Sequence, residues 1–74
     1  MPRLSPIRGR EFIHILETQG FFVIRQKGSH VRVEHPDGRK TTIPVHVGEL
    51  MGKGLLRKIL RDVQITPEMF GRLR

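Results

Sequence analysis

A run of alternating residues in the middle of the chain, from about 29 to 35, constrains the fold more than any other feature. Val31 and Val33 fall on one side of this run, and His30 and Arg32 fall on the other. Successive side chains of a β-strand point to opposite faces of a sheet, so this pattern is typical of a half-buried strand. If the valines face a core, His30 and Arg32 must face away from it.

Two further strands are predicted beside this run. Residues 21 to 26 are rich in aromatic and β-branched side chains, and Lys27-Gly28 after them is the expected turn. The Pro-Asp-Gly sequence at residues 36 to 38 predicts a tight turn into a third strand from about 39 to 45. Pro44 lacks a backbone N–H and therefore marks an edge or a strand end.

Helical patterns lie on both sides of the three strands. Apolar side chains recur at helical spacing in residues 9 to 19 and again in residues 53 to 63. Gly20 is expected to close the first helix as a left-handed cap. Thr66 is a favourable N-cap for a short terminal helix over residues 66 to 72.

This element order, α-β-β-β-α, predicts an α+β fold. The economical packing places two helices on one face of a three-stranded antiparallel sheet and leaves the other face open. The order matches the double-stranded-RNA-binding fold. A chain of 74 residues allows a single domain, 1 to 74, in which residues 1 to 8 form an extended lead. No apolar run is long enough for a membrane span or a signal peptide, so we expect a cytoplasmic protein without a membrane partner.

The charge of the chain favours a polyanionic partner. Fourteen Lys and Arg against seven Asp and Glu give a net charge of +7, in three basic groups at residues 3 to 10, 25 to 40 and 53 to 61. Nucleic acid explains this pattern better than a membrane surface, while the alternative is an ordinary solvated basic face. Lys53, between two glycines at a helix start, either binds phosphate or only accompanies a turn. The candidate phosphate-binding side chains are Arg25, Lys27, Arg32, Lys40 and Lys53.

His30 is the candidate for chemistry. No pair of carboxylates converges near it, and Ser29 points away from it if both belong to the strand. The histidines follow no metal-ligand spacing and there is no Cys, so neither a metal nor a cofactor is expected. RNA supplies its own nucleophile, the 2′-hydroxyl, so an imidazole need only accept or donate a proton. An exposed His on a basic surface can equally well only contact phosphate.

Several segments together resemble the HicA family of bacterial and archaeal toxins. The resemblance extends over about residues 4 to 70 and rests on Gly20-Phe21, on RQKGSH at 25 to 30, on HPDGR at 35 to 39, on IPVH at 43 to 46, and on KGLLRKIL at 53 to 60. It implies a small mRNA interferase with the double-stranded-RNA-binding fold, which inhibits translation and is paired with a HicB antitoxin that covers the active site.

The resemblance also implies roles for single residues. It makes His30 the catalytic residue, with Gly28 and Ser29 shaping the turn that presents it, and His46 as supporting structure or a substrate contact. Phe22 departs from the polar residue expected at its position. The first hypothesis is therefore a metal-independent endoribonuclease, slow and of low sequence specificity, that binds RNA and HicB as a homo-oligomer or a hetero-oligomer. The alternative is a non-catalytic RNA-binding or partner-binding module of the same fold.

Overall fold

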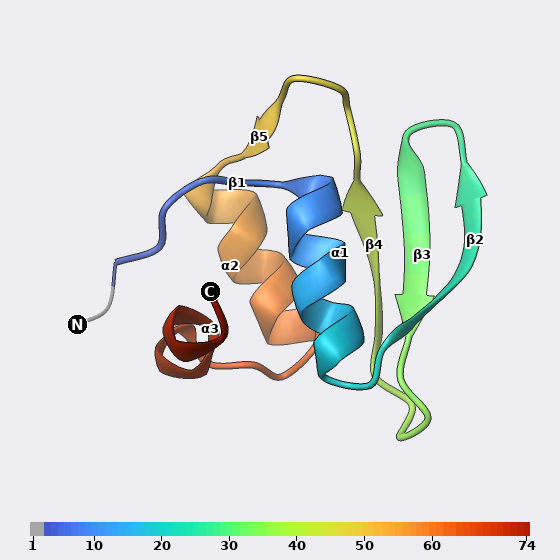
Figure 1. Ribbon diagram of the computed structural model, residues 1–74. Coiled ribbons are helices and arrows are strands. Elements are labelled where there is room, and N and C mark those ends of the chain that lie inside the picture. The colour runs from blue at the N-terminus through green and yellow to red at the C-terminus, as the bar shows by residue number, and fades with distance from the viewer. Residues whose placement is uncertain (1–2) are drawn as a thin grey trace.

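The computed structural model describes residues 3 to 74, and residues 1 and 2 of the expected lead lie outside the described part. The elements follow the order β1, α1, β2, β3, β4, β5, α2, α3 (Figure 1). Their bounds are Ile7–Arg8 for β1, Gly9–Thr18 for α1, Phe22–Lys27 for β2, His30–Glu34 for β3, Lys40–Pro44 for β4, Leu50–Met51 for β5, Lys53–Asp62 for α2 and Pro67–Leu73 for α3. No helix in this part of the chain has the length and apolar character that crossing a membrane requires.

The predicted α+β fold is confirmed. Strands β2, β3 and β4 form an antiparallel sheet in that order, and α1 and α2 pack on one side of it. Figure 1 shows the two helices beside β4, with β3 and then β2 progressively farther from them. Pro44 is the last residue of β4, as its missing N–H predicts.

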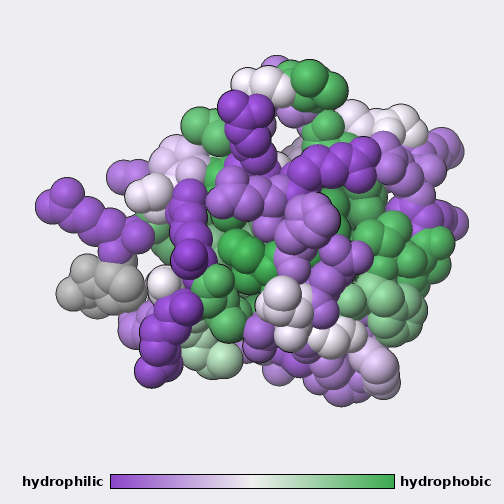
Figure 2. Space-filling model, in the orientation of Figure 1, coloured by the Kyte–Doolittle hydropathy of each residue, from purple (hydrophilic) through white to green (hydrophobic). Residues whose placement is uncertain are grey.

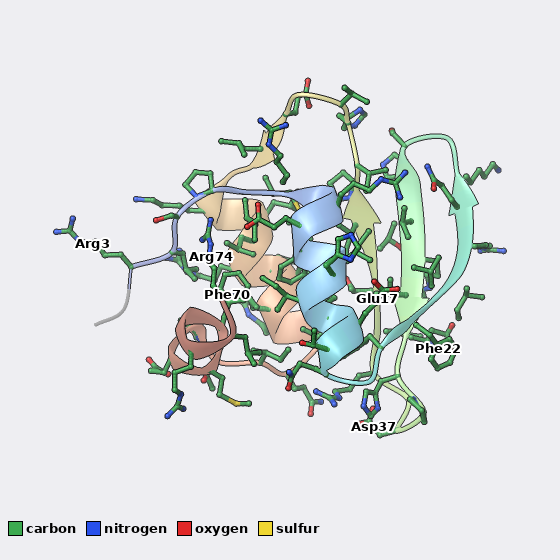
Figure 3. The ribbon with its side chains drawn as sticks, in the orientation of Figure 1. Arg3, Glu17, Phe22, Asp37, Phe70 and Arg74 are labelled. Carbon is green, nitrogen blue, oxygen red and sulfur yellow. The ribbon has the colours of Figure 1, made fainter. Side chains whose placement is uncertain are left out.

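The core lies between the helices and strands β3 and β4. The alternation in β3 is confirmed, since Val31 and Val33 are completely buried while His30 is exposed. Phe70 reaches inward from α3, and its ring lies 5.5 Å from that of Phe12 in α1 (Figure 3). The buried apolar side chains are Leu4, Ile7, Phe12, Ile13, Leu16, Phe21, Val31, Val33, Ile43, Met51, Leu56, Ile59, Leu60, Val63, Ile65 and Phe70.

The helix ends follow the sequence signals closely. Gly20 has a φ of +94°, the left-handed conformation expected of a residue that closes α1. The Thr66 hydroxyl accepts a hydrogen bond of 3.1 Å from the backbone N–H of Met69, so Thr66 caps α3 as predicted.

Two local expectations need correction. The turn between β2 and β3 is formed by Gly28 and Ser29, whereas Lys27 belongs to β2 and lies opposite His30. The extended lead also contributes to the fold, because Ile7 is buried and pairs with Met51 in the two-stranded sheet of β1 and β5. No local sequence pattern distinguishes Ile7-Arg8 or Leu50-Met51 from a loop. The two segments become strands only because they pair with each other, although they lie far apart in the sequence.

Strand β2 differs from its neighbours because all six of its residues are exposed. It pairs only with β3, and the register of that pairing shifts between Val23 and Arg25, so that Ile24 is the extra residue of a bulge. Figure 2 shows a hydrophobic patch over this edge of the molecule, where Phe22, Val23 and Ile24 are about half exposed.

Candidate active site on the open face of the sheet

A hollow of about 450 Å³ lies on the face of the sheet that the helices leave open. It contains one imidazole, three cationic side chains and one carboxylate. The residues that line it are Ile24, Arg25, Lys27, His30, Arg32, Glu34 and Thr42. All three strands contribute, so the hollow exists only when the sheet is assembled.

The strand register explains why these side chains meet. His30 lies opposite Lys27 in β2, and Arg32 lies opposite Arg25. Directly opposed residues of antiparallel strands project from the same face, with their Cβ atoms about 4.5–5.5 Å apart. Since Val31 faces the core, these four side chains must all face the other way.

The bulge at Ile24 decides how β2 contributes. Phe22 lies opposite Glu34 and Arg25 lies opposite Arg32, so both face the open side although they are three residues apart. Strict alternation would send residues three apart to opposite faces. The extra residue removes this conflict and adds the Ile24 side chain to the hollow.

Hydrogen bonds hold one of the cations and leave the others free to bind a ligand. The Arg32 Nη1 donates to the Thr42 Oγ1 at 3.2 Å, and its Nε lies 4.0 Å from the Glu34 Oε2. Within residues 3 to 74, the side chains of Arg25, Lys27 and His30 make no hydrogen bond or ion pair. The hollow therefore offers two unpaired cations and a free imidazole next to one anchored guanidinium.

The turn before His30 is built from Gly28 and Ser29. Gly28 has a φ of +59°, a left-handed conformation that glycine adopts without steric cost, and no atom would meet a Cβ there. Its carbonyl accepts a hydrogen bond of 3.0 Å from the side-chain amide of Gln26. The Ser29 carbonyl accepts a hydrogen bond of 2.7 Å from the backbone N–H of Val45, which ties the turn to the segment after β4.

His46 lies next to this turn. Its Nε2 is 3.4 Å from the Ser29 Oγ, and its ring centroid is 6.2 Å from that of His30 at an angle of 81°. His30 is paired with Pro44 in the sheet, and His46 follows two residues later. The sheet thus brings the two segments Gly-Ser-His and Pro-Val-His together.

Two of the five candidate phosphate ligands lie outside this hollow. Lys40 is at the far end of β4 and lines another hollow that also contains Asp37 and Asp62. The backbone N–H of Arg39 lowers the pKa of Asp37, and a hydrogen bond from Lys58 lowers the pKa of Asp62, so both carboxylates stay charged and oppose phosphate binding there.

Lys53 is the first residue of α2 and does not line the hollow around His30. Gly52 is the N-cap of α2 and provides no side chain for it. Only Arg25, Lys27 and Arg32, of the five candidates, surround His30.

Sequence reasoning missed three residues of the hollow, Ile24, Glu34 and Thr42. The alternation of β4 places Thr42 on the open side, and this signal was sufficient to find it. A bulge brings Ile24 into the hollow, and no local sequence pattern in β2 predicts that bulge.

The described residues contain no group of three or more His, Asp or Glu side chains placed to hold a metal ion. His35 follows the opposite end of β3 from His30, and its ring packs at 5.0 Å against Phe21. His30, His35 and His46 therefore do not gather at one point.

Comparison with known proteins supports the resemblance that the motifs suggested. Curated proteins gave no match. The family model described as HicA toxin of bacterial toxin-antitoxin matches residues 9 to 65, which is more than half of the chain. This range includes α1, the three-stranded sheet, α2 and every residue of the hollow. The chain therefore belongs to the HicA family, the toxins of bacterial toxin-antitoxin systems.

Proposed function

We propose that this toxin is an endoribonuclease that cleaves mRNA at the hollow around His30 and so inhibits translation. The observation that carries the proposal is the position of a free imidazole among three cations on an open sheet face. Cleavage of a phosphodiester needs two things from a protein, a proton-transfer group and positive charge beside the non-bridging oxygens.

The reaction uses the nucleophile that RNA itself contains. The 2′-oxygen bonds to the adjacent phosphorus while the bond from phosphorus to the 5′-oxygen breaks. The proton of the 2′-hydroxyl leaves to a base, and the departing 5′-oxygen gains a proton. The products are a 2′,3′-cyclic phosphate and a free 5′-hydroxyl, and His30 is the candidate for one of the two proton transfers.

Arg25, Lys27 and Arg32 would hold the phosphate. The fixed Arg32 guanidinium orients it, while Arg25 and Lys27 supply unpaired charge from the neighbouring strand. Phe22 carries the single exposed phenyl ring among residues 3 to 74, so few surfaces are available for base stacking. This supports cleavage of low sequence specificity, directed by the backbone rather than by the bases.

The test compares the purified chain with His30→Ala and with His14→Ala. His14 is an exposed imidazole on α1, away from the hollow, and therefore serves as the matched control. We expect His30→Ala to lower the rate of RNA cleavage by about 10²–10⁴-fold while RNA binding and thermal unfolding stay unchanged. His14→Ala should cleave like the parent chain, and in cells only His30→Ala should relieve the growth arrest.

Equal cleavage by the parent chain and His30→Ala, both folded, would falsify the catalytic role. RNA binding without cleavage by either protein would favour the non-catalytic module instead. Cleavage that persists in EDTA is also expected, because the proposed reaction assigns no step to a metal.

We further propose that the antitoxin is of the HicB type and covers the hollow, forming a hetero-oligomer with the toxin in the cytoplasm, where mRNA is translated. The three cations of the hollow favour contact with acidic side chains of the antitoxin. Ile24 and the neighbouring Phe22 favour contact with apolar side chains of the antitoxin. Titration of a HicB protein against the toxin at increasing salt separates these contributions. Weaker binding at high salt supports the charged contact, and salt-insensitive binding places the interface on Phe22 and Ile24.

A further inference from the structure

The second histidine of the site has no role in the function proposed above. His46 lies outside β4 in a loop, yet its position is determined from two sides. The backbone N–H of Val45 donates to the Ser29 carbonyl at 2.7 Å, and the Ser29 hydroxyl lies 3.4 Å from the His46 Nε2. The same dipeptide that turns the chain before His30 thus holds the segment that presents His46.

The two imidazoles stand in a relation that suits a shared reaction. Their ring centroids are 6.2 Å apart, and the planes are nearly perpendicular at 81°. Cleavage of RNA requires one proton transfer at the attacking 2′-oxygen and another at the leaving 5′-oxygen. In-line displacement puts these two oxygens on opposite sides of the phosphorus, so two separate groups a few ångströms apart serve it better than one.

The surroundings of the two rings differ, and this difference indicates which ring makes which of the two proton transfers. His30 lines the hollow with Arg25, Lys27 and Arg32, where the phosphate and the attacking ribose would be held. His46 lines a separate hollow with Pro44, Glu49, Leu50, Met51, Gly52 and Leu55, and the leucine side chains there would contact the nucleoside on the leaving side. Its Nε2 faces the Ser29 hydroxyl, so Nδ1 is the nitrogen that remains for the substrate.

We propose that His46 is a second catalytic residue, which donates a proton to the leaving 5′-oxygen while His30 accepts the proton of the 2′-hydroxyl. This inference rests on the proposed ribonuclease function. In each turnover His30 gains one proton and His46 loses one, and exchange with water restores both rings.

A substrate with an altered leaving group tests this role. We choose a DNA oligonucleotide with a single ribonucleotide, made once with the natural 5′-oxygen and once with sulfur in its place at the one cleavable linkage. A thiolate leaves without being protonated, so an enzyme that lacks only its general acid should recover on the sulfur substrate.

We expect His46→Ala to cleave the oxygen substrate about 10²–10⁴-fold more slowly than the parent chain and to cleave the sulfur substrate at close to the parent rate. His30→Ala should stay slow on both substrates, because its missing step is the first transfer. His46→Gln should behave like His46→Ala, since its amide N–H can still donate to Ser29 but cannot transfer a proton.

Three results would overturn the role of His46. Undiminished cleavage of the oxygen substrate by His46→Ala would show that the ring is dispensable. Recovery of that cleavage in His46→Gln would show a positioning role through Ser29. Persistent slow cleavage of the sulfur substrate by a folded His46→Ala would exclude acid catalysis. Failure of the ribonuclease proposal looks different, because the parent chain would then cleave neither substrate faster than His30→Ala does.

Discussion

Two valines that are paired across β2 and β3 differ strongly in how far they are buried. Val33 and Val23 are directly paired, yet Val33 is completely buried and Val23 is 43% exposed. The helices pack mainly against the side of the sheet nearest β4, and α1 contacts β2 through a hydrogen bond of 3.3 Å from the Arg10 Nη2 to the Gln26 Oε1. Strands β3 and β4 therefore combine core packing on one face with the candidate site on the other, whereas β2 adds cations and an exposed edge while contributing little to the core.

The largest effect on stability should come from truncating Val33, with Val23, its partner in the sheet, as the matched control. Val33→Ala removes two buried methyl groups and leaves a cavity, so we expect it to lower the free energy of unfolding by about 2 kcal/mol. Val23→Ala is the same chemical change at a half-exposed position and should stay within about 0.5 kcal/mol of the parent chain. Urea unfolding of both variants gives the comparison. Equal losses would mean that β2 is packed as tightly as β3.

The next effect concerns the charges that β2 brings to the site. Removing one cation that binds a phosphate of single-stranded RNA should reduce the slope of log affinity against log salt by about 0.7. We expect this from Arg25→Gln and from Lys27→Gln, with little change in unfolding. Lys53→Gln and Lys40→Gln are matched controls, because these lysines lie outside the hollow around His30. Filter binding at several salt concentrations measures the slopes, and equal reductions in all four variants would mean that no local site exists.

A smaller effect is expected from the exposed apolar residues of β2. Phe22→Ser removes the aromatic side chain of a residue that is 49% exposed and lies opposite Glu34 in the sheet. The free energy of unfolding should change by less than about 0.5 kcal/mol. Calorimetric scans of the toxin alone provide the measurement. A larger loss would assign Phe22 to the core rather than to a partner surface.

The smallest effect lies on the covered side, where a polar contact joins the sheet to α2. The Thr41 hydroxyl donates to the Asp62 Oδ2 at 3.0 Å, and Lys58 donates to the same oxygen at 2.9 Å. The hydrogen bond from Lys58, followed by that from Thr41, lowers the pKa of Asp62 below its ordinary value in the folded chain. The contribution of Asp62 to stability is therefore fully present above the ordinary pKa and is lost as the pH falls through the folded pKa.

We expect Asp62→Asn to be slightly less stable than the parent chain at pH 7, with the difference shrinking as the pH falls below about 4. Unfolding curves at about pH 7, 4 and 3 follow this change. A difference that grows on acidification would contradict the proposed ionic link.

The alternation of residues 29 to 35 was sufficient to predict the exposure of His30, because a strand's side chains alternate whatever the rest of the chain does, and the order of helical and strand patterns predicted the fold class. The capping roles of Gly20 and Thr66 were also predictable from the sequence, since a left-handed cap and an N-cap depend on local dihedrals and local hydrogen bonds. The turn at Gly28-Ser29 was misplaced by one residue, because either Lys27 or Ser29 can accompany a left-handed glycine.

The sequence by itself determined the order of the helices and of the three main strands, the open face of the sheet and the exposure of His30 on it. Tertiary structure alone decided which partners His30 has there. The register of β2 against β3 selected Arg25 and Lys27, the bulge at Ile24 added an apolar side chain, and the loop after β4 brought His46 to within 6.2 Å. Periodicity and capping act over a few residues, whereas register and loop closure depend on contacts between distant parts of the chain, and only the folded packing specifies them.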